Sequence, residues 1–136
     1  MAIVNNTARA LAFFEDKISF TTGPVELEHQ IKDGDDIVIV DVREAGDYAK
    51  GHIPGAINLP RGTWDDPQGL SKEKPNVVYC YTQTCHLAAH ACAVFAAKFF
   101  RVVEMEGGFE AWRANDSEIE TGLNRRQDKG QRAFSR

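Results

Sequence analysis

The chain has few cysteines, no long apolar run and no marked excess of charge of one sign. Three cysteines among 136 residues favour reduced thiols in a cytosol over a framework of disulfides. No stretch approaches the roughly 20 apolar residues that a membrane span needs, and the N-terminal residues lack the basic and apolar regions of a signal peptide. We therefore expect a cytoplasmic protein with no membrane partner.

The charge balance and the length narrow the class of protein further. A net charge of −4 gives no reason to expect nucleic acid as a partner. The 136 residues, 43% of them hydrophobic and 26% charged, suit one ordinary globular domain with its own core. We predict that this domain spans residues 18–114, between an N-terminal helical extension, 1–17, and a basic, solvated C-terminal tail, 115–136.

Short runs of apolar, β-branched residues alternate with helical segments along the chain. Strands are predicted at 37–41, 56–59, 76–80 and 102–105, with a strand or extended segment at 18–21. Helices are predicted at 7–14, from Pro24 to Gly34, and at 44–50, 86–100 and 109–113. Because strands without polar alternation are covered on both faces, the pattern predicts an α/β fold with a central, mainly parallel sheet flanked by helices on both faces.

Cys80 is the candidate reactive residue. It ends a predicted buried strand, and ligands of parallel sheets bind at the carboxyl ends of the strands. The loop that follows consists of Tyr81, Thr82, Gln83, Thr84, Cys85 and His86. Backbone N–H groups of such a loop lower the pKa of a thiol that they surround. Position alone leaves two interpretations open, an accessible and activated nucleophile or an inert buried cysteine.

Three segments, in the same order, resemble the signatures of rhodanese (thiosulfate sulfurtransferase) domains. They are Asp-Val-Arg-Glu at 41–44 with Gly-His-Ile-Pro-Gly-Ala-Ile-Asn-Leu-Pro at 51–60, Val-Tyr-Cys at 78–80, and Glu-Gly-Gly-Phe at 106–109 with Trp112. The resemblance implies one rhodanese-like domain in which Cys80 accepts sulfane sulfur as a persulfide. It also implies a small donor, thiosulfate or a persulfide, and a thiol or protein acceptor, with no cofactor.

The loop after Cys80 departs from that family. Many members have C-x-x-G-x-R-S, whereas this chain has C-Y-T-Q-T-C-H, without the glycine or the arginine. A fixed cation helps to bind anionic thiosulfate, so we expect weak use of that donor. Arg61 is the best candidate for a replacement cation, and His86 is a partial one. The resemblance further suggests that Asp41 and Arg43 pair structurally near the site.

Other functions remain open on the sequence. Cys85 follows Cys80 in a C-x4-C arrangement and is a candidate resolving thiol, as in a dithiol redox protein. A binding or sensing module with little turnover is also compatible with the altered loop. A cysteine phosphatase is remote, because such sites need an arginine that this loop lacks. His86 and His90 share a helix face, but no clear fourth ligand accompanies them, and we predict no metal site.

Overall fold

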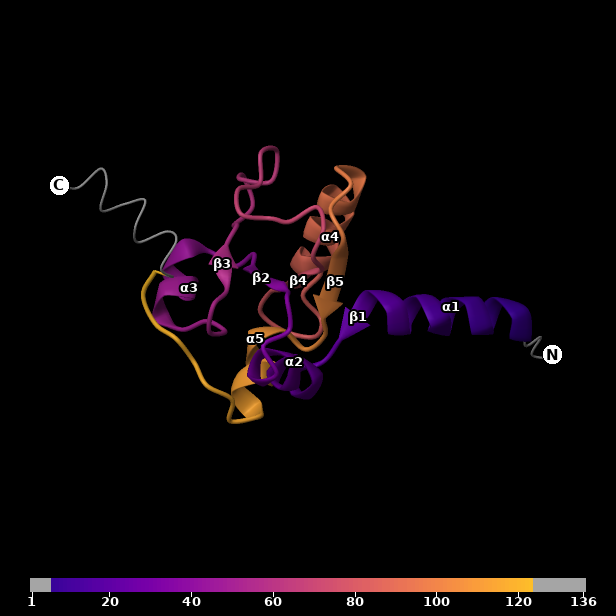
Figure 1. Cartoon of the computed structure of the whole chain (residues 1–136), viewed down its shortest axis with the longest axis horizontal. Helices are drawn as coiled ribbons and strands as arrows, with labels where there is room; N and C mark the ends of the chain where they lie inside the picture. The colour runs from indigo at the N-terminus through magenta and orange to yellow at the C-terminus, as the bar shows by residue number, and fades with distance from the viewer. Residues whose placement is uncertain (1–5, 124–136) are drawn as a thin grey trace.

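In the computed structural model, which describes residues 6–123, the strands form one sheet in the order β1-β5-β4-β2-β3 (Figure 1). The strands are β1 (Thr21–Thr22), β2 (Val38–Asp41), β3 (Ile57–Asn58), β4 (Asn76–Tyr79) and β5 (Val102–Met105). Every pairing between neighbouring strands is parallel. The predicted α/β class is therefore confirmed, with β4 as the central strand.

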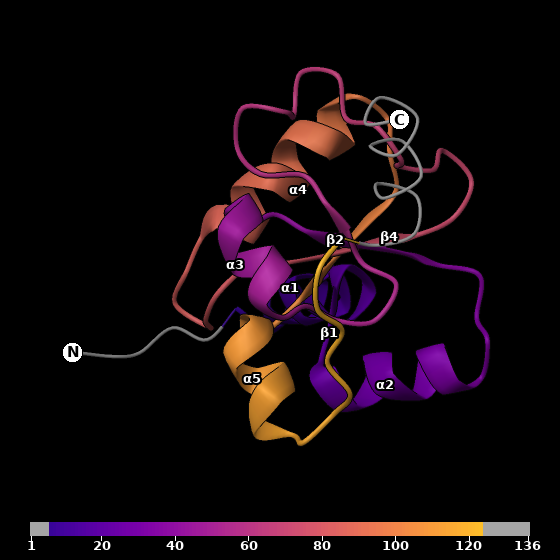
Figure 2. The ribbon, with the colours of Figure 1, turned by 90° about the vertical axis from the view of Figure 1, so that its left-hand side faces the viewer.

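Helices cover both faces of the sheet. They are α1 (Thr7–Phe20), α2 (Pro24–Lys32), α3 (Ala45–Lys50), α4 (Leu87–Ala97) and α5 (Gly108–Ala114). Helices α4 and α5 lie on opposite sides of the sheet (Figure 2). Val77 and Tyr79 of β4 pack in one apolar cluster with residues of α2, α3 and α5, whereas Val78 packs in another cluster with residues of α4. Because side chains alternate along a strand, Cys80 follows Val78 onto the α4 face.

Helix α1 is longer than the sequence predicts. Asn6, rather than Thr7, caps it, with the side chain accepting a hydrogen bond of 3.1 Å from the backbone N–H of Arg9. No glycine or proline interrupts the helix before Thr21, so the strand or extended segment predicted at 18–21 is wrong for its first three residues. The helix buries no residue and extends away from the sheet (Figure 1). Neither it nor another helix within residues 6–123 is long and apolar enough to cross a bilayer.

Helix α4 ends three residues before its predicted end. Phe99 adopts a left-handed conformation with φ 70°, and the N–H of Phe100 binds the carbonyl oxygen of Phe95 at 3.0 Å. This is the hydrogen-bond pattern of a Schellman cap, which stops a helix.

The first residues of the predicted tail pack against the domain. Ser117 is buried, and the backbone of Glu120 pairs with that of His52 through N–O distances of 2.8 and 2.9 Å. The basic residues that define the tail, from Arg125 onward, lie outside the described residues.

Candidate active site

Cys80 lies immediately after β4, at the carboxyl edge of the sheet, and its side chain is only 2% exposed. Of the two interpretations that its position left open, the accessible one does not hold, because Cys80 is packed against helix α4. Instead it borders a cavity of about 250 Å³. The lining residues are Cys80, Thr82, Gln83, Cys85, His86, Ala89, Glu104, Met105, Glu106 and Gly107. Of the predicted loop residues, Tyr81 and Thr84 do not line this cavity.

The start of α5 supports the loop. The backbone N–H of Phe109 donates to the carbonyl oxygen of Cys80 at 2.8 Å, and that of Glu110 donates to the carbonyl oxygen of Tyr81 at 3.0 Å. Gly108 has φ +64°, and a Cβ atom there would lie 2.5 Å from the carbonyl carbon of Tyr81. Only glycine allows both this conformation and this close approach.

The Cys80 thiol is not activated in the way that the loop sequence suggests. Its Sγ donates a hydrogen bond of 3.4 Å to the carbonyl oxygen of Cys85. Burial, followed by a hydrogen bond with the Cys85 side chain, raises the pKa of Cys80 to about 11. The backbone N–H groups of Ala88 and Tyr81 lower this pKa but do not outweigh burial. The predicted depression of the Cys80 pKa is therefore wrong.

Cys85 is instead the thiol whose pKa is lowered. Burial acts to raise this pKa, but the hydrogen bond with Cys80 and the backbone N–H groups of Leu87, Tyr81 and Thr82 together lower it. Of the loop N–H groups that were expected to act on Cys80, that of Tyr81 acts on both thiols and that of Thr82 on Cys85. Cys92 lies in α4 and packs against the apolar cluster on that face of the sheet. Burial raises its pKa to about 12. Cys85 is therefore the most acidic of the three thiols.

Two carboxylates at this cavity were not anticipated from the sequence. Glu104 and Glu106 come from β5 and the residue after it, and β5 pairs directly with β4. Burial, and then the charge of Glu106, raises the pKa of Glu104, while His86 and Lys17 lower it. Lys17 of α1 forms an ion pair of 2.8 Å with Glu106. The sequence predicted the strand at 102–105, which holds Glu104, but it could not show which strand lies beside it in the sheet.

Arg61 does not supply the missing cation. Its guanidinium lies 5.6 Å from the ring centre of Trp64, and it is not among the residues that line the cavity. The prediction that it faces the same mouth as Cys80 is therefore not supported. His86 does line the cavity, and no lysine or arginine between residues 6 and 123 does so.

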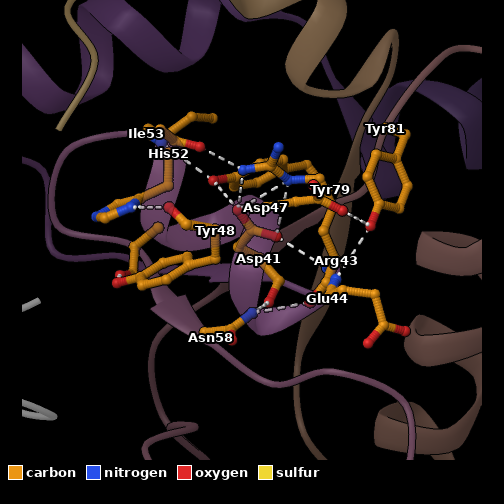
Figure 3. A network of polar contacts seen from close by, with 12 residues as sticks. Asp41, Arg43, Glu44, Asp47, Tyr48, His52, Ile53, Asn58, Tyr79 and Tyr81 are labelled. Atoms are coloured by element: carbon orange, nitrogen blue, oxygen red, sulfur yellow. Dashed lines mark hydrogen bonds and ion pairs between the residues drawn. The ribbon is translucent and has the colours of Figure 1, made fainter. Parts of the chain in front are cut away.

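Asp41 and Arg43 form the predicted structural pair (Figure 3). The Asp41 side chain is fully buried, and its Oδ2 lies 2.8 Å from a guanidinium nitrogen of Arg43. The Tyr79 hydroxyl donates to the same oxygen at 2.6 Å and accepts from the Ile53 N–H at 3.0 Å. Burial raises the pKa of Tyr79 well above its ordinary value. The network holds Tyr79, the residue before Cys80, on the face of the sheet opposite the cavity.

A larger cavity of about 760 Å³ is lined by residues of α3 and α5 together with Tyr81 and Thr82. It contains no cysteine, so the smaller cavity at Cys80 is the better candidate for chemistry. Within the described part of the chain, no three or more His, Cys, Asp or Glu side chains gather as metal ligands would.

Comparisons with known proteins agree with this geometry. The model of the rhodanese-like domain family matches residues 23–115. Over 92 residues, the chain is 35% identical to thiosulfate sulfurtransferase GlpE of Pseudomonas putida, covering 67% of this chain and 83% of that protein. The crystal structure of the BH2092 protein from Bacillus halodurans is 36% identical, with a TM-score of 0.79, and covers 91% of this chain and 98% of that one. A rhodanese-like domain protein from Staphylococcus aureus is 26% identical, with a TM-score of 0.65 over 75% of this chain and 97% of that one.

Proposed function

The chain belongs to the rhodanese-like domain family, and we propose that it is a sulfurtransferase in which Cys80 carries the transferred sulfur. The observation that carries the proposal is the location of Cys80. It follows the central strand directly and borders a small cavity at the carboxyl edge of a parallel sheet, where such folds bind ligands. The curated relative named as a thiosulfate sulfurtransferase supports the reaction class.

The reaction consists of two exchanges at sulfur. In the first, Cys80 attacks the outer sulfur of a donor R–S–SH, the donor S–S bond breaks, and a Cys80–S–SH persulfide forms with release of R–SH. The proton of the Cys80 thiol passes to the leaving sulfur, so atoms and electrons balance. Because the pKa of Cys80 is about 11, the thiol needs a base near neutrality. The lowered pKa and hydrogen bond of Cys85 make it the candidate base.

The second exchange regenerates the enzyme. An acceptor thiol attacks the outer sulfur of the Cys80 persulfide, takes that sulfur, and returns Cys80 to the thiol. The backbone N–H groups of Tyr81 and Ala88, which already act on the Cys80 sulfur, support the persulfide between the two exchanges.

One observation favours a second candidate function. Cys80 Sγ donates a hydrogen bond to the carbonyl oxygen of Cys85, and the two thiols shift each other's pKa values in opposite directions. A pair of this kind suits a dithiol protein in which the Cys85 thiolate attacks a mixed disulfide on Cys80. The oxidant would be a low-molecular-weight disulfide, which is reduced to two thiols as the Cys80–Cys85 disulfide forms.

Intact mass distinguishes the two candidates. The purified protein and its Cys80→Ser and Cys85→Ser variants are incubated separately with an organic persulfide, with thiosulfate and with an organic disulfide. A reductant-sensitive gain of one sulfur atom that Cys80→Ser abolishes, and that Cys85→Ser slows but does not abolish, supports sulfur transfer with Cys85 as the base. Loss of two hydrogens that both variants abolish supports the dithiol function. If Cys80→Ser gains sulfur as fast as the unsubstituted protein, Cys80 is not the sulfur carrier.

A further inference from the structure

Acidic side chains outnumber basic ones at the cavity beside Cys80. Two carboxylates, Glu104 and Glu106, line it, and no lysine or arginine in the described part of the chain does. The Lys17 ammonium forms an ion pair of 2.8 Å with Glu106. His86, on the loop side, is the one lining residue that can carry positive charge.

Two guanidinium groups that could replace the missing loop arginine are engaged elsewhere. Arg43 is 4% exposed and is held by Asp41, with its guanidinium carbon 4.1 Å from the ring centre of Phe109. Arg61 stacks on Trp64. Neither can bind an anion at Cys80 without breaking these contacts.

Resting on the proposed function, we propose that the Cys80 cavity takes sulfur from organic persulfides that are uncharged or cationic beside the transferred sulfur. It discriminates against thiosulfate and other oxyanion donors. The Glu104 and Glu106 carboxylates are the specificity-determining groups, and an ammonium-bearing donor is favoured over a carboxylate-bearing one.

The charge of the donor matters when it enters the cavity, and the charge of its product matters when it leaves. Thiosulfate enters as a dianion, and when its leaving group takes the Cys80 proton the cavity still holds two anions, hydrogen sulfite and the persulfide anion. A protonated persulfide enters uncharged and leaves as a neutral thiol once it has taken the Cys80 proton. In a partly buried site, where opposing charges are poorly screened, we expect each added negative charge on the donor to slow sulfur loading by about tenfold.

The carboxylates of the cavity also set the direction in which salt changes the rate of sulfur loading. A cavity that attracted thiosulfate through a cation would lose activity as ionic strength rises. A cavity that repels thiosulfate gains activity as ionic strength rises, because salt screens the repulsion. We expect the rate with thiosulfate to increase with salt and the rate with an ammonium-bearing persulfide to decrease.

The test compares two persulfides of similar size and opposite charge, with thiosulfate as a third donor. Sulfur loading of Cys80 is timed by intact mass with cysteamine persulfide, 3-mercaptopropionate persulfide and thiosulfate, at low and high salt. We expect the second-order rate constant for the cysteamine donor to exceed that for the mercaptopropionate donor by about tenfold or more. Glu104→Gln should reduce this ratio to about threefold or less and accelerate loading by thiosulfate.

Three further variants complete the test. Glu106→Gln, which frees Lys17, should change the ratio in the same direction as Glu104→Gln and keeps the test available if one variant folds poorly. Lys17→Met should slow thiosulfate further, because it leaves Glu106 uncompensated. Glu73→Gln, an exposed residue that does not line the cavity, should leave all three rates unchanged.

The outcomes separate the inference from the proposed function. Equal rates for the two persulfides, or a thiosulfate rate that falls with salt and is unaffected by Glu104→Gln, overturn the inference alone. If no donor places sulfur on Cys80, the proposed sulfurtransferase function fails, and the inference fails with it.

Discussion

The Sγ atom of Cys80 lies 3.4 Å from the carbonyl oxygen of Cys85 and donates a hydrogen bond to it. The loop between the two cysteines thus folds back on itself, and the backbone N–H of Tyr81 acts on both thiols. The buried thiol has the raised pKa and the more exposed one the lowered pKa. The reactivity of either cysteine therefore depends on the presence of the other.

Alkylation should reveal this coupling. With iodoacetamide at increasing pH, Cys85 should react first, Cys80 only as the pH approaches its pKa of about 11, and Cys92 last. The Cys85→Ala variant removes the hydrogen bond and the charge that raise the Cys80 pKa, so its Cys80 should react at lower pH. Fragment-ion mass spectrometry locates the modified residue. An unchanged Cys80 profile in the variant would show that burial alone sets the pKa.

The ion pair of Asp41 and Arg43 should dominate the stability of the sheet edge. Asp41→Asn keeps the shape of the side chain but leaves the guanidinium buried without its counter-charge. We expect the free energy of unfolding in urea to fall by about 3–5 kcal/mol. Asp36→Asn is the matched control, because its pair with Lys74 has the same kind of geometry, at 2.9 Å, but the Asp36 side chain is 79% exposed. The control should lose less than about 1 kcal/mol.

Gly108 should be intolerant of any side chain. Gly108→Ala places a Cβ atom against the backbone of Tyr81 and Thr82 in addition to the cost of a positive φ. Gly55→Ala carries only the second cost, since it has φ +82° and open space around the added atom. We expect Gly55→Ala to lose about 1 kcal/mol and Gly108→Ala at least about 2 kcal/mol more. Similar losses at the two sites would contradict the close packing of α5 on the loop.

The carboxyl of Glu104 should couple stability to pH. Its pKa is raised in the folded protein, chiefly by burial, so the folded state holds that proton more tightly than the unfolded state does. Protonated Glu104 stabilises the folded state fully below the ordinary glutamate pKa of about 4.3. This contribution is lost as the pH rises through the raised pKa.

The matching variant makes this dependence measurable. Glu104→Gln should gain stability relative to the unsubstituted protein as pH rises through that window, by less than about 1 kcal/mol because the residue is only half-buried. Urea unfolding at several pH values tests it, and Glu73→Gln, an exposed carboxylate, is the control. A stability difference that does not change with pH would contradict the raised pKa.

The local pattern of apolar residues in the sequence was sufficient to predict the order of strands and helices. The apolar runs at 37–41 and 76–80 predicted buried parallel strands, because strands covered on both faces need no polar positions. It also located Cys80 at a strand end, whereas the pairing of Asp41 with Arg43 was suggested by the family resemblance. Helix α1 was less predictable, since alternation over 18–21 does not exclude a continuing helix, and Asn6 begins that helix one residue earlier.

By itself, the sequence determined the family, the parallel sheet and the position of the candidate nucleophile, since these depend on local periodicity and on residues close together along the chain. Only the tertiary structure decided the charge of the cavity and the order of thiol acidity. Glu104 approaches Cys80 because β5 is the neighbour of β4, and Lys17 approaches Glu106 because α1 leads into β1 beside β5. Burial raises the pKa of Cys80 above that of Cys85, and burial depends on how distant segments pack together.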